Sequence, residues 1–402
     1  MGRLIEIGRA FVAARWGRRR WPPPVADCPI ETAAQFEDRF AERNVLGVSQ
    51  EQARREAERE LAGERPAAFP GYSFGLSTGT TGRPGVFLTS ETERHLWVGA
   101  VVAKFLPLRL LLGADVALVL KHNNRLYMDA GRLLRLHYFN AGAPVGEWAE
   151  RLCALSPQVL IGPPGVLEQI AVSAAFERHL FRPQVLLAGA EPLFPQDRAT
   201  LTDAFGVQPR VIYQAKEGFL GAECRHGGIH LNEDLIRFED IEVGRRRFVP
   251  VITDFTRTSQ VYRRFRLDDI LIRRAGRCAC GKSLRLVEAV EGRAQDVLLL
   301  LGGSRLFPHE VNALLQPHIG GRDYQVSQVS EDEATLAVAG GTPTGAAAAL
   351  ARYLRVAVQE YVAPAPGEKR RRVKRMFDLR NAWLDESDAS GNAHRGAIIP
   401  VV

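Results

Sequence analysis

The sequence lacks long apolar runs and is poor in cysteine. None of its segments approaches the about 20 consecutive apolar residues that cross a bilayer, so no membrane span is predicted. The first residues, MGRLIEIGRAFVAARWGRRRW, contain only a short apolar segment that Glu6 and Arg9 interrupt, which argues against a cleaved signal peptide. The five cysteines are an odd number and a poor disulfide framework for a chain of 402 residues. These absences predict a protein of the reducing cytoplasm.

Basic residues are in excess, 53 against 46 acidic ones, which gives a formal net charge of +7. Much of the excess lies in two runs, RWGRRRW (15–21) and EKRRRVKR (368–375). A basic surface suits small anions as well as nucleic acid, and the sequence contains no recognisable nucleic-acid-binding module, so we expect no nucleic-acid partner. For the N-terminal segment we expect an amphipathic helix packed on the protein, with weak attachment to an anionic membrane surface as the alternative.

Apolar and helical segments alternate through the first half of the chain. Between Phe74 and Val211, the short apolar runs VFL, DVALVL, QVLIG and QVLLAGA are separated by stretches with helical spacing. Such alternation predicts βαβ units on a mainly parallel sheet. From about Gly227 to Leu300 the apolar spacing changes to period two with polar turns, which predicts a β-rich layer.

The end of the chain has the pattern of a compact α+β unit. The pattern predicts a strand (DVLLLLG), a helix (HEVNALLQ), two strands (DYQVSQVS and EATLAVAG) and a long helix (AAAALARYLRVAVQEYV). The expected fold class is therefore α/β, with a large N-terminal domain of βαβ units and a β-rich layer, followed by a small α+β C-terminal domain. The predicted segments are an N-terminal helical region (1–66), the large domain (67–295), the small domain (296–380) and a tail (381–402).

One stretch, FGLSTGTTGRPGVFL (74–88), combines hydroxyl residues and glycines between apolar flanks. Glycines allow a backbone to bring its N–H groups close to an anion, and hydroxyls donate to phosphate oxygens. The stretch does not have the Walker pattern, because no Gly-Lys-Ser/Thr sequence ends it. On these residues alone, a phosphate-binding loop and a polar hairpin turn both remain open.

Four further segments follow in order: GAEPL (189–193), YQAKEG (213–218), RFRLDD (264–269) and GRAQD (292–296). Together with STGTTGRPG they resemble the signatures of the adenylate-forming superfamily, which includes acyl-CoA synthetases, aryl-acid ligases and the adenylation domains of peptide synthetases. The resemblance covers about residues 30–310. It is nearest to the phenylacetate-CoA ligase branch, and within it to adenylate-forming relatives of the synthetase of a methanogen deazaflavin coenzyme; the strings YQAKEGFLGAEC, HLNEDL, VITDFTRTSQ and CACG carry this narrower likeness.

The resemblance implies a role for each matching residue. The β- and γ-phosphates of ATP would be held by the loop residues Ser77, Thr78, Gly79, Thr80, Thr81 and Gly82. The adenine pocket would be formed by Gly189, Ala190, Glu191, Tyr213 and Gln214, with the tyrosine ring stacked on the base. Glu217 would hold Mg²⁺, Asp269 would accept hydrogen bonds from the ribose hydroxyls, and Arg293 would meet the phosphate or ribose. Without the surrounding motifs, Asp269 and Arg293 would be interpreted as a surface ion pair.

Two positions depart from the superfamily pattern. Lys216 stands where a threonine that bonds the α-phosphate is usual, and Gly85 stands where many members have lysine. The Lys216 ammonium could pair with phosphate as a point charge, or the change could mark altered substrate choice or lost activity. In the C-terminal domain of the superfamily, a lysine bridges the carboxylate and the α-phosphate. The resemblance implies Lys369 for this role, and Lys374 is the second candidate. The alternative for both residues is a basic run exposed to solvent.

Three cysteines and a histidine form two clusters, Cys224-Arg-His-Gly-Gly-Ile-His230 and Cys278-Ala-Cys280. Thiolate and imidazole ligands in this number are those of a tetrahedral structural Zn²⁺, and some relatives in the ligase branch bind zinc near this place. We therefore predict a zinc-binding insert near residues 224–280, with Cys224, His230, Cys278 and Cys280 as ligands. His226 is a substitute for His230, and four unconnected core or surface residues are the alternative.

The resemblance implies an ATP-dependent, AMP-forming ligase whose chemistry depends on Glu217, Lys216, Lys369 and Arg293. It would activate a small-molecule carboxylic acid as an acyl adenylate, and its mobile C-terminal domain would rotate at about Gln295 before transfer to a thiol or amine of an acceptor such as coenzyme A or a carrier protein. Apolar residues around Tyr138 hint at an apolar or aryl acid. The alternatives are a nucleotidyl transferase that leaves AMP on its acceptor and a nucleotide-binding pseudoenzyme. A dimer is one option for the oligomeric state.

Overall fold

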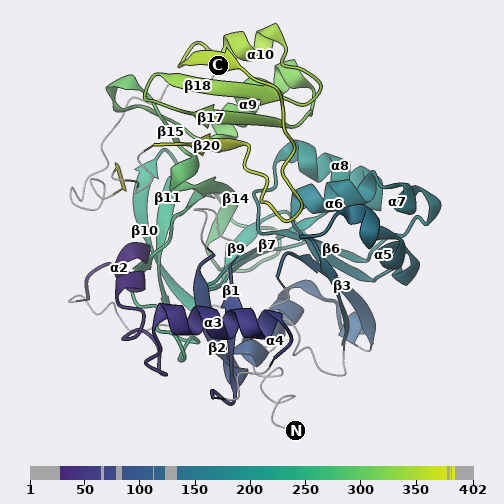
Figure 1. Cartoon of the computed structure of the whole chain (residues 1–402), viewed down its shortest axis with the longest axis vertical. Helices are drawn as coiled ribbons and strands as arrows, with labels where there is room; N and C mark the ends of the chain where they lie inside the picture. The colour runs from purple at the N-terminus through teal and green to yellow at the C-terminus, as the bar shows by residue number, and fades with distance from the viewer. Residues whose placement is uncertain are drawn as a thin grey trace.

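The structure is a computed structural model, and it describes residues 28–64, 68–77, 84–111, 113–122, 134–377, 381 and 383–384 of the chain. Figure 1 shows a large body around a long curved sheet, with a smaller α+β unit packed across the top of it. Among the described residues the long sheet contains twelve strands, which pair in parallel at one end and antiparallel at the other.

The parallel half of the long sheet is covered by helices on both faces. Its strands are β3 (Ala114–Leu120), β4 (Leu134–Asn140), β5 (Val159–Gly162), β6 (Val185–Gly189) and β7 (Arg210–Ala215), in the spatial order β4-β3-β5-β6-β7. One face packs against α4 (Glu91–Phe105), and the other against α5 (Ala149–Leu155), α6 (Pro164–Ala171), α7 (Ala174–Arg178) and α8 (Pro195–Phe205). Successive side chains of a strand face opposite sides, so Val116 packs with α4 and Ala117 with the other helices. Burial on both faces explains the apolar runs of this half and confirms the predicted βαβ units.

The antiparallel half continues from β7 and forms the predicted β-rich layer. Its strands are β8 (Gly218–Glu223), β9 (Ile229–Leu231), β10 (Ile236–Gly244), β11 (Arg247–Asp254), β12 (Phe265–Arg266), β13 (Asp269–Arg273) and β14 (Leu286–Arg293). They follow the order β8-β9-β14-β13-β11-β10, and β12 pairs with β11 beside this path. The connections of the large body also contain the 3-10 helices η1 (Leu108–Leu111) and η4 (Val145–Glu147).

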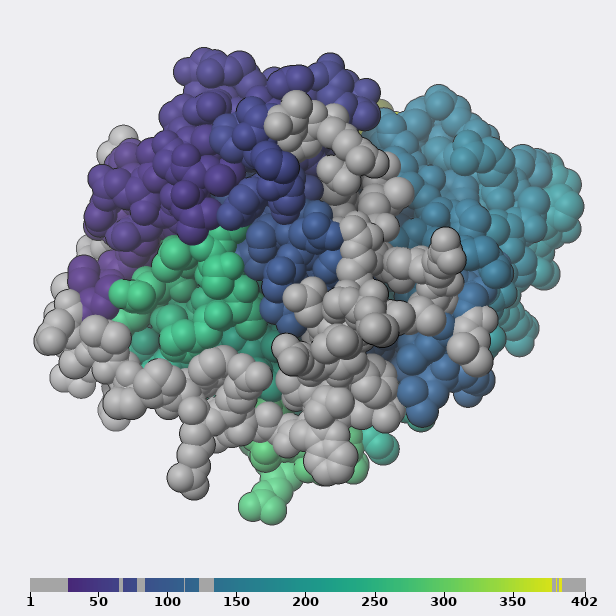
Figure 2. Space-filling view, turned by 90° about the horizontal axis from the view of Figure 1, so that it is seen from below, coloured from purple at the N-terminus to yellow at the C-terminus, as the bar shows by residue number. Residues whose placement is uncertain are grey.

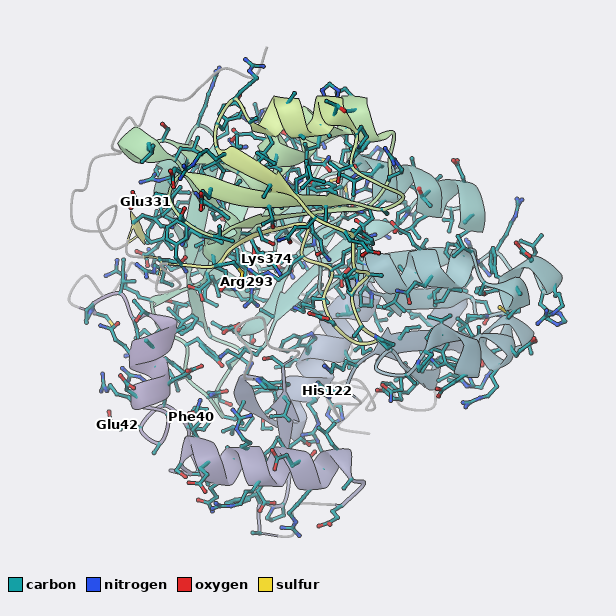
Figure 3. The ribbon with its side chains drawn as sticks, turned by 45° about the horizontal axis from the view of Figure 1, so that its top comes forward. Phe40, Glu42, His122, Arg293, Glu331 and Lys374 are labelled. Atoms are coloured by element: carbon teal, nitrogen blue, oxygen red, sulfur yellow. The ribbon has the colours of Figure 1, made fainter. Side chains whose placement is uncertain are left out.

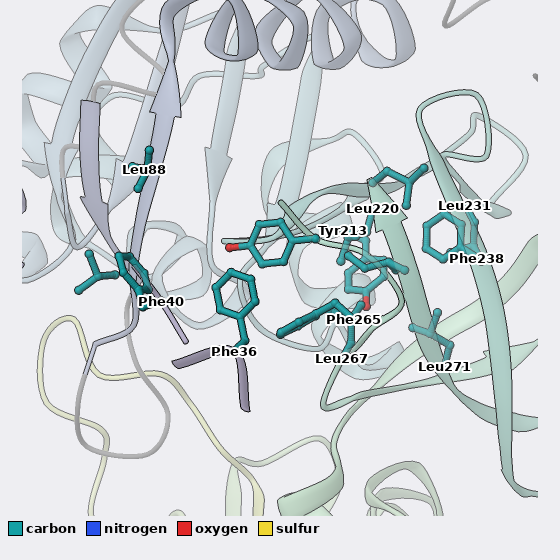
Figure 4. Packing of buried hydrophobic residues seen from close by; sticks show 14 of the residues in the cluster. Phe36, Phe40, Leu88, Tyr213, Leu220, Leu231, Phe238, Phe265, Leu267 and Leu271 are labelled. Atoms are coloured by element: carbon teal, nitrogen blue, oxygen red, sulfur yellow. The ribbon is translucent and has the colours of Figure 1, made fainter. Parts of the chain in front are cut away.

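Two N-terminal helices pack against different parts of the large body: α2 (Ala33–Asp38) packs against this antiparallel half, and α3 (Gln50–Leu61) packs against the strands at residues 72–76 and 86–90. Phe36 of α2 stacks on Tyr262 with the ring centroids 4.9 Å apart, and Phe265 meets Phe36 edge-on. Figure 4 shows Phe36 and Phe265 in one core together with Tyr213. Figure 2 shows the same region from below, where the purple N-terminal helices border the green residues of the antiparallel strands.

The stretch FGLSTGTTGRPGVFL forms a hairpin rather than part of the parallel sheet. Strands β1 (Tyr72–Leu76) and β2 (Val86–Ser90) pair antiparallel with each other in a separate sheet. The expectation that VFL belongs to the parallel sheet is therefore wrong, because its backbone partners are supplied by the strand directly before it. Thr89 and Ser90 then lead into α4, where the Ser90 hydroxyl caps the helix by accepting from the Glu93 amide.

The small unit contains a four-stranded sheet with two helices. Its elements are α9 (Pro308–Ile319), β17 (Tyr324–Gln328), β18 (Glu333–Val338), α10 (Thr344–Leu350), β19 (Arg355–Val358) and β20 (Val373–Arg375), and the strands lie in the order β19-β18-β17-β20. A connecting segment holds η5 (Ala294–Asp296), β15 (Leu298–Leu299), η6 (Leu301–Gly303) and β16 (Arg305–Leu306). None of the helices among the described residues has the length and apolar character that crossing a bilayer requires.

The long C-terminal helix that the sequence predicts is interrupted. Helix α10 ends at Leu350, and the residues that follow turn back to form β19, which pairs in parallel with β18. Val356 and Val358 are β-branched and favour a strand, while the buried Leu350 and Leu354 anchor the turn between the two elements. The predicted strand DVLLLLG is likewise reduced to the two residues of β15 before η6.

Candidate active site

The predicted nucleotide-binding segments lie at the carboxyl ends of the parallel strands. β6 ends at Gly189 and β7 at Ala215, so Ala190–Glu191 and Lys216–Glu217 directly follow neighbouring strands. Ligands of open α/β sheets bind at this edge. Because each motif follows the end of a neighbouring parallel strand, the two motifs lie at one edge of the sheet.

The hydroxyl-rich stretch connects β1 to β2. At the base of this connection the Ser77 amide donates to the Gly85 carbonyl oxygen at 2.8 Å, and the Gly85 amide donates to Ser77 Oγ at 2.9 Å. The remaining residues predicted to bind phosphate lie outside the described residues: Thr78, Gly79, Thr80, Thr81 and Gly82. Strands β1 and β2 therefore form a hairpin around this connection, and the phosphate-binding role of the connection stays a prediction.

Lys216 places its ammonium at the base of this hairpin. A side-chain carbon built at Gly85 would lie 2.8 Å from Lys216 Nζ and 3.2 Å from Ser77 Oγ, so the glycine leaves the space that the lysine occupies. The ammonium pairs loosely with two carboxylates, at 3.5 Å from Glu37 Oε1 and 3.9 Å from Glu217 Oε1. The residue that departs from the motif therefore adds a positive charge beside the hairpin connection.

Glu217 is buried in the turn between β7 and β8, and Arg257 fixes the backbone of this turn. Arg257 Nη1 donates to the carbonyl oxygens of Lys216 at 2.9 Å and Glu217 at 3.3 Å, while its Nη2 donates to the carbonyl oxygen of Leu88 in β2 at 2.8 Å. Burial raises the pKa of the Glu217 carboxyl above its ordinary value, and the nearby Lys216 opposes that shift. Carboxylate oxygens are ligands that Mg²⁺ prefers. The backbone that carries the Glu217 carboxylate is fixed by Arg257, which also binds strand β2 of the hairpin.

Three predicted site residues, Tyr213, Asp269 and Arg293, form one linked group. Tyr213 donates from its hydroxyl to Asp269 Oδ2 at 2.9 Å, and Arg293 Nε lies 3.7 Å from Asp269 Oδ1. Asp269 and Arg293 are register partners on β13 and β14, which is why they meet. Burial, followed by the Asp269 charge, raises the pKa of Tyr213 well above its ordinary value, so the phenol stays a neutral donor. Figure 3 shows Arg293 where the long sheet meets the small unit.

The segment that follows β6 turns sharply. A side-chain carbon at Gly189 would lie 2.8 Å from Ile212 Cγ2, so a glycine is needed for the close packing against β7. Ala190 has a φ of 68°, a left-handed conformation that is uncommon for non-glycine residues and that clusters at functional sites. Gln214, the remaining residue of the predicted adenine pocket, accepts at Oε1 from the indole N–H of Trp97 at 3.3 Å.

The basic run near the end of the chain crosses the same edge of the sheet, and its residues Lys369–Arg372 are called the basic strap below. The Arg370 amide donates to Glu191 Oε1 at 2.9 Å, which joins the strap to the segment after β6. Lys369 interacts electrostatically with Glu191, and burial together with the Arg293 charge lowers the pKa of its ammonium to about 8. The strap is thus engaged with the site rather than solvated.

The two candidate lysines of the C-terminal unit differ in their surroundings. The Lys369 charge interacts with Glu191, Asp269 and Arg293, which are all predicted site residues. Lys374 lies inside β20, between the buried residues Val373 and Arg375. The position of Lys369 fits the predicted role better.

The four predicted metal ligands come together in one cluster. One ligand atom from each of Cys224, His230, Cys278 and Cys280 lies within 4.8 Å of the others, and the cluster contains His230 rather than His226. The Cys224 and Cys278 sulfurs are 3.4 Å apart, and Cys280 Sγ is 3.2 Å from His230 Nε2. Ligand atoms about 2.0 to 2.3 Å from one ion lie roughly 3.3 to 3.8 Å apart in a tetrahedral site, so small movements of these atoms would place them around one ion.

The surroundings of His230 also suit a metal ligand. Its Nδ1 lies 3.3 Å from the carbonyl oxygen of Leu284, which leaves Nε2 directed to the cysteines. Burial lowers the pKa of the imidazole below its ordinary value, which favours the neutral form that binds metals. The cluster joins the β8–β9 hairpin to the segment before β14, and it lies on different elements from the segments after β6 and β7.

Several functional candidates escaped the sequence motifs. Arg257 lies within the string VITDFTRTSQ, but its contact with the turn at Lys216 depends on a sequence separation of about 40 residues. Glu168 and Asp197, which bind the basic strap, belong to helices between the motifs. The one local signal is Asp197 itself, an acidic residue in the first turn of α8 after Pro195.

Comparison with known proteins identifies the fold. No family model matches the chain, and no curated protein matches it either. Among solved structures, 2-hydroxyisobutyryl-CoA ligase in its postadenylation state aligns with 96% of this chain and 88% of its own, at 18% identity and a TM-score of 0.64. The anthranilate-CoA ligase AuaEII in complex with anthranoyl-AMP aligns with 77% of this chain and 67% of its own, at 12% identity and a TM-score of 0.54.

The amide bond synthetase McbA from Marinactinospora thermotolerans is a third similar structure, with 76% of this chain and 68% of its own aligned at 17% identity and a TM-score of 0.53. These proteins are acyl-CoA ligases and an amide synthetase. At such identities the similarity shows the fold, so this chain has the fold of these ligases and the predicted α/β fold class is confirmed.

Proposed function

We propose that the chain is an ATP-dependent, AMP-forming ligase that activates a carboxylic acid and transfers the acyl group to a thiol or amine. The observation that carries this proposal is the position of Lys369, which the C-terminal strap brings to Glu191, Asp269 and Arg293 at the carboxyl edge of the sheet. A reaction between a carboxylate and ATP joins two anions, so its barrier is mainly electrostatic and positional. Cations from distant parts of the chain at one sheet edge suit that reaction.

In the proposed reaction a carboxylate oxygen attacks the α-phosphorus of ATP, the bond from that phosphorus to pyrophosphate breaks, and pyrophosphate leaves. Lys369 would bridge the carboxylate and the α-phosphate, and Lys216 would pair with a phosphate oxygen as a point charge. Glu217 would hold Mg²⁺, which neutralises phosphate charge when bound. These roles follow the resemblance, and they are supported by the distances around Lys216 and by the charged groups that surround Lys369.

The nucleotide would be held between the hairpin and the segments after β6 and β7. Asp269 would accept from the ribose hydroxyls, and Arg293 beside it would meet ribose or phosphate. Phosphate would be bound by Ser77 and the loop residues Thr78, Gly79, Thr80, Thr81 and Gly82, and adenine by Gly189, Ala190, Glu191, Tyr213 and Gln214. The strained φ of Ala190 supports a binding role for this turn.

The arrangement of the small unit supports an adenylation state. With equal coverage of 2-hydroxyisobutyryl-CoA ligase, the TM-score is 0.64 for its postadenylation state and 0.53 for its thioesterification state. Because the same protein is compared in both cases, the difference reflects how the two bodies are arranged. The complex of that ligase with coenzyme A also supports a thiol such as coenzyme A as the acceptor.

We also propose that Cys224, His230, Cys278 and Cys280 hold a structural Zn²⁺. Four protein ligands complete a tetrahedral shell and leave no position for a substrate. The metal would therefore stabilise the antiparallel half of the sheet rather than take part in adenylation.

Exchange of labelled pyrophosphate into ATP, measured with a panel of aliphatic and aryl acids, tests the proposed reaction. We expect acid-dependent exchange in the wild-type protein and its loss in the Glu217→Gln variant. If no acid supports exchange above that variant although ATP binds, the chain is a nucleotide-binding protein without this activity. Mass spectrometry of a product mixture separates the remaining alternative, since a ligase releases free AMP and a nucleotidyl transferase leaves AMP on the acceptor.

A further inference from the structure

Three arginines follow Lys369, and each of them binds a carboxylate. Arg370 Nη1 lies 2.5 Å from Glu168 Oε2. Arg371 pairs with Asp296 at the start of the connection to the small unit. Arg372 makes a bidentate contact with Asp197, with Nη1 at 2.7 Å from Oδ2 and Nη2 at 2.8 Å from Oδ1.

Asp197 is the most deeply engaged of these carboxylates. It is 2% exposed, and besides Arg372 it meets Arg370 Nη2 at 3.2 Å. Its Oδ2 also accepts from the Phe194 amide at 3.2 Å, as an acidic residue in the first turn of a helix does. Two guanidinium groups of the strap thus share one buried carboxylate of the large body, an arrangement with strong charge-assisted hydrogen bonds.

The anchors of the strap lie far from it in sequence and close to the site in space. Glu168 is 202 residues from Arg370 and belongs to α6, while Asp197 is 175 residues from Arg372 and belongs to α8. Consecutive Cα atoms are about 3.8 Å apart, so fixing Arg370 also restricts where Lys369 can lie. The Glu191 carboxylate reinforces this restriction by accepting from the Arg370 amide.

We propose that Asp197 and Glu168 are positioning residues that clamp the basic strap and thereby hold Lys369 at the site during adenylation. The proposal rests on the proposed function for the role of Lys369, but the clamp itself can be tested without it. Separating the strap from α6 and α8 would leave a buried carboxylate without its cations, which is costly. The clamp therefore favours the adenylation arrangement and has to open before the small unit can rotate for acyl transfer.

Asp323 provides a matched control for Asp197. It also binds Arg372, with its Oδ1 2.6 Å from Nε, but it lies next to β17 within the small unit. Asp323→Asn weakens the ion pairing of Arg372 within the small unit, but it leaves the contact of Arg372 with Asp197 of α8 in place. Glu168→Gln is the milder clamp variant, because it changes the contact with Arg370. Asp197→Asn also changes a helix cap, since Asp197 accepts from the Phe194 amide at the start of α8.

Trypsin tests the clamp directly, because it cleaves after lysine and arginine and needs an accessible strap. Full-length wild-type protein should resist cleavage after residues 369–372, since the strap is held against the large body. In Glu168→Gln and Asp197→Asn we expect cleavage there to be about tenfold faster, because cleavage follows the population of the open form. Asp323→Asn should remain close to wild type, and circular dichroism checks that every variant is folded.

Pyrophosphate exchange then tests the effect on Lys369. Both clamp variants should lose about 10- to 100-fold in kcat, since a displacement of about 1 Å can have this effect, with KM for ATP changed less than about twofold, because the nucleotide contacts remain. Equal protection of the strap in wild type and both clamp variants would overturn the proposal. So would an equal loss of exchange in Asp323→Asn, since the arginine network would then only stabilise the fold.

The two proposals can fail separately. If wild-type protein shows no exchange with any acid, the proposed function fails while trypsin still decides whether the clamp exists. If exchange is present and the clamp variants retain both protection and rate, only the clamp is wrong.

Discussion

Single glycines decide where charge can enter the candidate site. Gly85 has no side chain, and the Lys216 ammonium lies where that side chain would be, beside Ser77 at the base of the hairpin. Lys216, which departs from the sequence motif, therefore occupies the space that a side chain at position 85 would fill. Lys216 and Gly85, the two positions that depart from the superfamily pattern, therefore form one local arrangement rather than two independent changes.

The Gly85→Ala variant tests this arrangement. The new methyl group would lie 2.8 Å from Lys216 Nζ, so the ammonium must move away from the hairpin. We expect pyrophosphate exchange to fall roughly tenfold, as for other small displacements of site groups. Gly146→Ala is the matched control, because nothing lies within 4 Å of its added carbon. Equal rates in the two variants would mean that Lys216 has no part in the reaction.

The charge of Lys369 predicts a pH dependence. Its pKa is lowered to about 8 by burial and by Arg293, and a lysine is cationic below its pKa. The kcat/KM for ATP in the exchange assay should therefore decrease as the pH rises through about 8. Lys369→Arg keeps its charge at these pH values, so any residual activity should lack this decrease. A wild-type decrease only near the ordinary lysine pKa of about 10.4 would contradict the assignment.

The proposed metal site would act on strands rather than on substrate. Cys224 and His230 belong to the β8–β9 hairpin, while Cys278 and Cys280 lie in the segment before β14. Because β8 pairs with β7, which carries Tyr213 and Gln214, a metal bound by the cluster would stabilise one side of the candidate site indirectly. A structural metal contributes directly to folding free energy.

Removal of one ligand should therefore lower stability and metal content together. We expect Cys280→Ser to bind less than one equivalent of zinc by elemental analysis and to melt roughly 5 °C or more below wild type. Cys28→Ser, which changes a cysteine outside the cluster, should keep both values. Unchanged zinc content in Cys280→Ser would show that the cluster is not the metal site.

Elements with their own local signal could be predicted from the sequence. The strands β3, β5 and β6 are continuous apolar runs because both faces are covered, and α9 has clear helical spacing. The expectations for β2, in the parallel sheet, and for β19, within a helix, are wrong because pairing partners decide the role of each segment: β2 pairs with β1, and β19 pairs with the edge of β18. Local pattern does not contain that information.

The same limit applies to the site. Candidate residues such as Glu217 and Asp269 could be selected from the sequence because each lies in a recognisable string, and their roles stay predictions. The contacts of Asp197 and Glu168 with the strap could not, because they join segments 175 and 202 residues apart. A run of basic residues has the same appearance in sequence whether its partners are water or buried carboxylates.

The two bodies of the molecule meet through charge as well as apolar contact. Besides the clamp, Arg247 and Glu291 of the long sheet contact Glu310 and His309 at the start of α9. Glu291 is fully buried, and its oxygen accepts from the His309 amide at 2.6 Å. Buried pairs are little screened by salt, so the position of the small unit should depend on these residues and only weakly on ionic strength.

A glycine in the small unit offers the sharpest test of how closely the bodies must approach. Gly367 lies two residues before Lys369, and a side-chain carbon there would be 2.8 Å from Gly142 Cα and 3.2 Å from Lys121 Cδ in the large body. Gly367→Ala should push the strap away from the sheet edge and reduce exchange by about tenfold or more.

Gly321 separates this effect from backbone strain. Its φ of 82° is close to the 73° of Gly367, so alanine costs a similar amount of backbone strain at both positions, but nothing lies within 4 Å of the carbon added at Gly321. Gly321→Ala should therefore lower the melting temperature about as much as Gly367→Ala while keeping the rate of exchange. If both variants lose the same activity, the loss comes from the stability of the small unit, and close contact between the bodies is not required for adenylation.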